Sequence, residues 1–95
     1  MEIKLHKPNI FFDQKIDKAA KAAGCYARIK WARVDACRFI LVDRPMSTKP
    51  ASFEQHDAVI LALLQLDPQA TIRTARATYE SLEDFEAQKA ARVPA

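Results

Sequence analysis

Residues 25–43 constrain the fold more than any other stretch, because their side chains alternate in a way that a helix does not accommodate. β-Branched and aromatic residues accumulate there in two runs, CYARIKWARV and ACRFILVD. This composition and alternation are typical of two strands joined by a tight turn. A turn at residues 35–36 would pair Trp31 with Ile40, whereas a slip of one residue would pair Trp31 with Phe39. The sequence therefore predicts an antiparallel β-hairpin and leaves its register open.

Helical periodicity lies on both sides of the hairpin. The first helix has an apolar stripe spaced by threes and fours, made of Phe12, Ile16, Ala19 and Ala23. Gly24, the only glycine of the chain, stands where this helix should end. Ser52 and Gln55 have the spacing of a capping box, which predicts a second helix that continues through Leu66. Residues 2–6 alternate like a short strand, which we expect at an edge of the sheet.

The segment ILALLQLDPQATIRTARATYES, residues 60–81, can be interpreted as a helix-turn-helix or as the elbow of a helical hairpin. Asp67 and Pro68 are typical of the start of a new helix. Gly, Pro and Asn, the residues that break helices, do not occur between Thr71 and Val93. The presumed reading helix is also acidic, which would repel phosphate. We therefore predict one continuous last helix to about residue 92.

These elements together predict an α+β fold in the order β-α-β-β-α-α. The β-hairpin packs against helices, and the first strand can extend the sheet to three strands. The chain ends in a helical hairpin. Residues 1–92 are expected to form a single compact domain and residues 93–95 a disordered tail. The side chains expected in the core include Trp31, Ile60, Leu63, Leu64 and Leu82.

The composition is that of an ordinary globular chain, since 49% of the 95 residues are hydrophobic and 28% are charged. The longest apolar run is far shorter than the roughly 20 residues of a membrane span, and the first residues lack the apolar core of a signal peptide. A cytoplasmic location without a membrane partner is therefore predicted. Cys25 and Cys37 are too few for a disulfide scaffold, so reduced thiols are expected.

Charge is distributed unevenly along the chain. Residues 1–44 carry a net charge of +5 and residues 45–95 carry −2. The basic half could meet an acidic partner, although +5 is modest beside a dedicated nucleic-acid binder.

Two groups of residues are candidate partner-binding sites. Tyr26, Arg28 and Lys30 alternate along the predicted hairpin and so share one face in either register. Arg73 and Arg76 would lie one turn apart near the start of the last helix, where they could hold an anion or an acidic partner. The simpler alternative for Arg76 is an ion pair with Glu80.

Catalytic and cofactor chemistry find little support in the sequence. The possible metal ligands His6, Cys25, Cys37 and His56 have no zinc-like spacing. One glycine cannot make a Gly-rich phosphate loop. Catalytic residues, cofactors and metals are therefore not expected, and the chain is predicted not to be an enzyme.

The predicted function is that of a non-enzymatic protein-binding module, an adaptor or inhibitor that occupies a site on a larger macromolecular assembly. A small phage or mobile-element inhibitor of host defence, of the anti-CRISPR kind, fits the same profile. The alternative is a small nucleic-acid-binding transcriptional regulator that uses the basic N-terminal half. The arrangement of five cations would distinguish the two functions. One contiguous patch of them would favour nucleic acid, whereas dispersed cations would favour a protein partner; these cations are Lys15, Lys18, Lys21, Arg28 and Lys30. The oligomeric state is left open.

Overall fold

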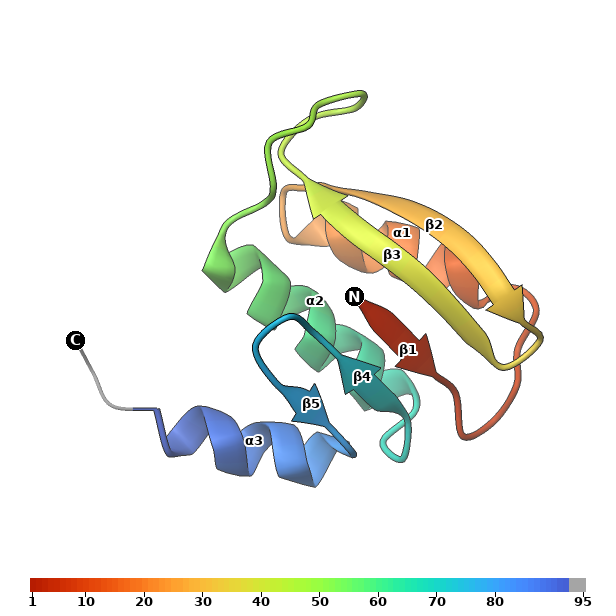
Figure 1. The fold of residues 1–95 in the computed structure, drawn as a ribbon, viewed down its shortest axis with the longest axis vertical. Coiled ribbons are helices and arrows are strands. Elements are labelled where there is room, and N and C mark those ends of the chain that lie inside the picture. The colour runs from red at the N-terminus through yellow and green to blue at the C-terminus, as the bar shows by residue number, and fades with distance from the viewer. Residues whose placement is uncertain (93–95) are drawn as a thin grey trace.

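The computed structural model describes residues 1–92 of the chain. Five strands and three helices follow one another as β1 (Glu2–Lys4), α1 (Phe12–Ala22), β2 (Tyr26–Arg33), β3 (Ala36–Val42), α2 (Phe53–Leu66), β4 (Thr71–Arg73), β5 (Thr78–Tyr79) and α3 (Leu82–Ala90) (Figure 1). The α+β class is confirmed. The predicted disordered tail lies outside the described residues.

The strands form one antiparallel sheet in the order β2-β3-β1-β4-β5. The first six elements therefore have the β-α-β-β-α-β connectivity of a split βαβ arrangement, with β5 added beside β4. Helices α1 and α2 cover one face of the sheet and leave the other open (Figure 1). The expected edge position of the first strand is wrong, because β1 pairs with β3 on one side and with β4 on the other.

The core lies between the sheet and the helices, and α2 is its centre. Ser52 caps this helix as predicted: its hydroxyl accepts from the Gln55 N–H at 3.2 Å, and the Gln55 carboxamide accepts from the Ser52 N–H at 2.8 Å. Ile60, Leu63 and Leu64 are buried, as expected. Trp31 and Leu82 are only half-buried against this core, so their prediction holds in part.

Gly24 ends the first helical segment as predicted. Its φ is +82°, a left-handed conformation that glycine adopts without steric cost. The chain thus turns directly from α1 into β2.

The hairpin of β2 and β3 has neither of the registers considered from the sequence. Trp31 pairs with Cys37, and a bulge between Trp31 and Arg33 shifts the pairing before the turn. This register places the alternate residues of β3, Cys37 and Phe39 among them, on the covered face, where both are buried. Because paired residues share a face of the sheet, this burial excludes the pairing of Trp31 with Ile40, whose side chain is exposed on the other face.

The predicted helical hairpin after α2 does not form. Residues 71–79 make the β4–β5 hairpin instead, with Ile72 paired to Tyr79 and both buried. The turn uses the side chain of Thr74, whose Oγ1 accepts from the N–H groups of Arg76 at 3.2 Å and Ala77 at 3.0 Å. A threonine hydroxyl thus forms a turn in a segment that contains no Gly, Pro or Asn. A helix-turn-helix is equally absent from this described segment.

The last helix is short and begins later than predicted. Ser81 caps α3 by accepting from the Asp84 N–H at 3.0 Å. Asp67, expected to start a helix, is buried instead, and its Oδ2 accepts from the N–H groups of His6 at 2.9 Å and Lys7 at 3.1 Å. It therefore fixes the chain between β1 and α1. Within residues 1–92, no helix has the length and apolarity needed to cross a bilayer.

Candidate partner-binding surface

The uncovered face of the sheet carries basic side chains from four strands. Because side chains alternate along a strand, those beside the buried Ile3, Cys37, Phe39 and Ile72 point to the opposite, open side. We call this surface the basic face, and its cations, all exposed, are Lys4, Arg28, Lys30, Arg38 and Arg73.

A single cross-strand row forms the middle of the basic face. Lys30 is paired with Arg38, Arg38 with Glu2, and Glu2 with Arg73. Like charges directly opposite each other on neighbouring strands destabilise a sheet. The pairing of Lys30 with Arg38 is therefore unfavourable in the free protein.

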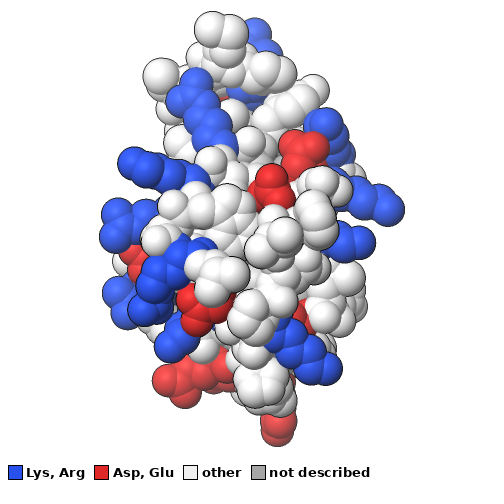
Figure 2. All heavy atoms as spheres, turned by 90° about the vertical axis from the view of Figure 1, so that its right-hand side faces the viewer, with Lys and Arg blue, Asp and Glu red and all other residues white. Residues whose placement is uncertain are grey.

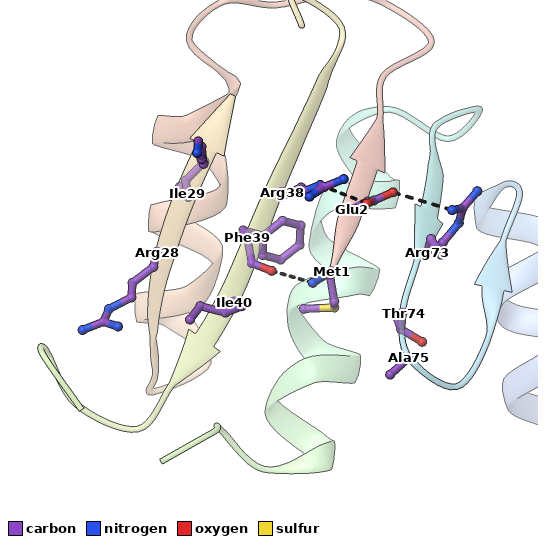
Figure 3. A pocket seen from close by; sticks show the side chains of 11 residues that line it. Met1, Glu2, Arg28, Ile29, Arg38, Phe39, Ile40, Arg73, Thr74 and Ala75 are labelled. Carbon is purple, nitrogen blue, oxygen red and sulfur yellow. Dashed lines mark hydrogen bonds and ion pairs between the residues drawn. The ribbon is translucent and has the colours of Figure 1, made fainter. Parts of the chain in front are cut away.

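Glu2 lies between two arginines and holds both (Figure 3). Its Oε1 lies 3.0 Å from Arg38 Nε, and its Oε2 lies 3.8 Å from Arg73 Nη1. The arginine side chains remain about 70% exposed, at 72% and 70%. Exposed pairs of this kind add little stability. Their effect is to orient the two guanidinium groups while leaving most of their N–H donors to solvent.

The face is hollowed between its arginines into a shallow groove of about 550 Å³. Figure 3 shows Arg28 and Ile40 on one side of this groove and Arg73, Thr74 and Ala75 on the other. Ile40 is 51% exposed and Tyr26, at the edge, is 37% exposed. The surface thus combines oriented cations with some exposed apolar area.

Four of the five predicted site residues share this face. Tyr26, Arg28 and Lys30 lie on it as the alternation of β2 predicts, and Arg73 joins them from β4. Arg76 does not, because it lies in the β4–β5 turn.

The guanidinium carbon of Arg76 lies 3.0 Å from the centre of the Phe53 ring, on α2. The predicted anion site at a helix N-terminus is therefore wrong, since Arg73 and Arg76 belong to a β-hairpin and point to different neighbours.

Arg38 and Lys4 are members of the basic face that the sequence did not single out. Lys4 lies on β1, both of whose neighbouring strands are far away in the chain, and Arg38 faces β1 from β3. The alternation along β3 puts Arg38 and Ile40 on one face of the strand, but only the strand order places that face beside Glu2.

The basic residues of α1 belong to a separate surface. Lys15, Lys18 and Lys21 are exposed on the helix that covers the opposite side of the sheet, and Lys21 pairs with Asp17 at 2.9 Å. Figure 2, seen from the side on which β2 lies, shows Lys and Arg on both flanks of a mostly uncharged band. The five cations named from the sequence therefore do not form one contiguous patch.

The cysteines and histidines are not gathered into a site. Cys25 and Cys37 are buried free thiols, and burial raises the pKa of Cys37 to about 11. The His56 ring contacts the Ser52 carbonyl through Nδ1 at 2.8 Å. Among residues 1–92, no three His, Cys, Asp or Glu side chains lie close enough together to hold a metal ion.

Comparison of the chain with protein-family models, with curated proteins and with solved structures gave no match.

Proposed function

We propose that the chain is a protein-binding module that docks its basic face on an acidic surface of a partner. It acts as an adaptor or inhibitor by occupying that site on a larger assembly. The observation that carries the proposal is the row in which Lys30 stands opposite Arg38 while Glu2 orients Arg38 and Arg73.

Electrostatic repulsion within the row favours binding of an anion. Bringing a carboxylate near Lys30 and Arg38 replaces a like-charge contact by attraction, so part of the binding free energy comes from relief of an unfavourable contact. Local sequence choices that lower stability are expected chiefly at functional sites.

The arginines also suit carboxylates geometrically. A guanidinium group offers several N–H donors in a planar fork that matches a carboxylate. Because Glu2 already restricts Arg38 and Arg73, less side-chain entropy is lost when a partner carboxylate binds. The exposed side chain of Ile40 adds apolar area beside them.

Nucleic acid is the weaker candidate for this surface. Sheets that bind single strands stack bases on aromatic side chains. The central strands β3 and β1 present Arg38, Ile40, Glu2 and Lys4 to the open side, and none of these four side chains is aromatic. We therefore expect weak, salt-sensitive binding of nucleic acid that does not depend on sequence.

The test compares two double variants that remove the same charge from opposite sides of the sheet. Arg38→Gln/Arg73→Gln neutralises two cations of the basic face, and Lys15→Gln/Lys18→Gln neutralises two on α1. A partner captured from the source cells by the wild-type chain is purified, and its affinity for each variant is measured by calorimetry.

The expected result is a loss of about tenfold or more in affinity for the basic-face variant, equivalent to about 1.4 kcal/mol, and little change for the α1 variant. Equal losses in the two variants would contradict docking through the basic face. If the captured complexes disappear after nuclease treatment, the partner is a nucleic acid and not a protein.

A further inference from the structure

Strand β2 is an edge strand along its whole length. It is the outermost strand of the sheet, and α1 lies behind it (Figure 1). Its pairing with β3 is regular from Tyr26 to Trp31, so the six residues before the bulge form an ordinary strand. Alternate residues of such an edge direct their N–H and C=O groups outward. Among residues 1–92, no segment forms hydrogen bonds with that outer side.

The opposite edge of the sheet is protected. Strand β5 has only two residues, and α3 packs beside it. The Gln88 side chain donates from Nε2 to the Thr78 carbonyl at 3.0 Å, and Asp84 accepts from the Glu80 N–H at 2.9 Å. Native proteins commonly cover or shorten edges in this way to prevent pairing. The two edges are thus treated differently, and β2 is the one left available.

The side chains of β2 define what could pair with it. Tyr26, Arg28 and Lys30 lie on the basic face, while Ile29 and Trp31 are half-buried on the side of α1. The side chains of a strand added beside β2 would lie alternately next to the residues of the basic face and next to Ile29 and Trp31. Acidic side chains would therefore match one face, and small apolar side chains would match the other.

From this edge we infer that an extended acidic segment of the partner protein adds to β2 as a sixth strand. Its backbone pairs with the outer side of residues 26–31, and its alternate carboxylates meet Arg28 and Lys30. The inference rests on the proposed protein-binding function and assigns it a partner chemistry: a strand that alternates acidic and small apolar residues.

A second copy of this chain does not fit the same edge. Antiparallel pairing of two β2 strands with their basic faces on one side would bring Arg28 and Lys30 of each copy beside those of the other. Repulsion between these cations disfavours self-association, as charged residues on edge strands commonly do. The free protein is accordingly expected to be monomeric in sedimentation experiments.

The test uses a fluorescent peptide of about ten residues, long enough to span a strand, in which Glu alternates with Val or Thr. Binding to the wild-type chain is followed by fluorescence anisotropy. A matched peptide with Lys in place of Glu reports the contribution of charge. Two further peptides are N-methylated at two adjacent backbone positions in turn, because an added strand directs only alternate N–H groups toward its neighbour.

The Glu peptide is expected to bind, and the Lys peptide is not. N-methylation at one of the adjacent positions should weaken binding about tenfold or more, whereas methylation at the other should have little effect. Binding that is equally sensitive to both positions, or to neither, would overturn strand addition while leaving docking on the basic face intact. Absence of binding by the Glu peptide would also overturn it. The proposed function fails separately, through the Arg38→Gln/Arg73→Gln comparison.

Discussion

The hydroxyl of Thr74 both donates to the Ala77 carbonyl and accepts from the Ala77 N–H, each at 3.0 Å. Replacing Thr74 with Val keeps the shape of the side chain and removes these two bonds together with the one that the hydroxyl accepts from the Arg76 N–H. We expect a loss of about 1–3 kcal/mol in the free energy of unfolding, because the partly buried Ala77 N–H loses its partner. Urea titration measures it. Thr78→Val is the control, since that side chain is exposed, and a similar loss in both variants would contradict the role of the turn.

Arg92 and Asp57 tie the end of α3 to α2. Arg92 Nη1 lies 2.6 Å and Nη2 3.2 Å from the two Asp57 oxygens, and the Asp57 side chain is only 13% exposed. Arg92→Met should lower the free energy of unfolding by about 1.5–3 kcal/mol, because it leaves that carboxylate without its charged partner. Arg33→Met removes the exposed pair with Asp35 and should cost about 0.5 kcal/mol or less. Equal costs in denaturant titration would be the contrary result.

The stability of the fold should fall in alkaline solution through Cys37. Burial raises the pKa of this thiol from its ordinary 9.0 to about 11, with the nearby Asp13 charge adding to the shift. Below pH 9 both folded and unfolded chains keep the proton, so ionisation of the thiol does not change the free energy of unfolding. Between pH 9 and 11 the unfolded chain releases it first, and the free energy of unfolding falls by up to about 1.4 kcal/mol per pH unit.

Urea titrations at pH 8 and pH 10 would measure this fall. The Cys37→Ala variant lacks the ionisable group and should lose less stability over the same interval, since only the remaining groups titrate. Identical pH dependence in the variant and the wild type would show that the Cys37 thiol does not carry the effect.

Lys30→Glu should separate stability from binding. The substitution places opposite charges across from each other on β2 and β3, so the free energy of unfolding should rise by about 0.2–1 kcal/mol. The same change should lower the affinity for the partner, because it removes a cation that would contact the partner's carboxylates. In both stability and affinity, Lys30→Gln should lie between the wild type and Lys30→Glu. A Lys30→Glu variant that is less stable than the wild type would mean that the pairing with Arg38 is not repulsive.

Local signals in the sequence predicted the elements that depend on local contacts. Ser52 with Gln55 and the left-handed Gly24 mark helix ends through interactions between residues close together in the chain. The alternation of Tyr26, Arg28 and Lys30 likewise placed them on one face without knowledge of the register.

The errors arose where distant segments decide the outcome. Residues 71–79 have a spacing that fits a helix, yet Ile72 gains burial only by lying beside β1 as a strand. Ser81 followed by Asp84 is a capping signal for α3 that the sequence did contain. Arg38 could not be assigned to the site, because its place beside Glu2 depends on the strand order. The cytoplasmic location and the inhibitor role stay predictions.

The position of β1 at the middle of the sheet has a consequence for the kinetics of folding. Each hairpin closes between segments that are near neighbours along the chain, but β1 must pair with β4, where Ile3 lies opposite Ile72, 69 residues later in the chain. Contacts of such long sequence separation form slowly, because the loop-closure entropy is lost before the contact gains any free energy. The two hairpins are therefore expected to form early and to join into one sheet only when the first residues of the chain insert between them.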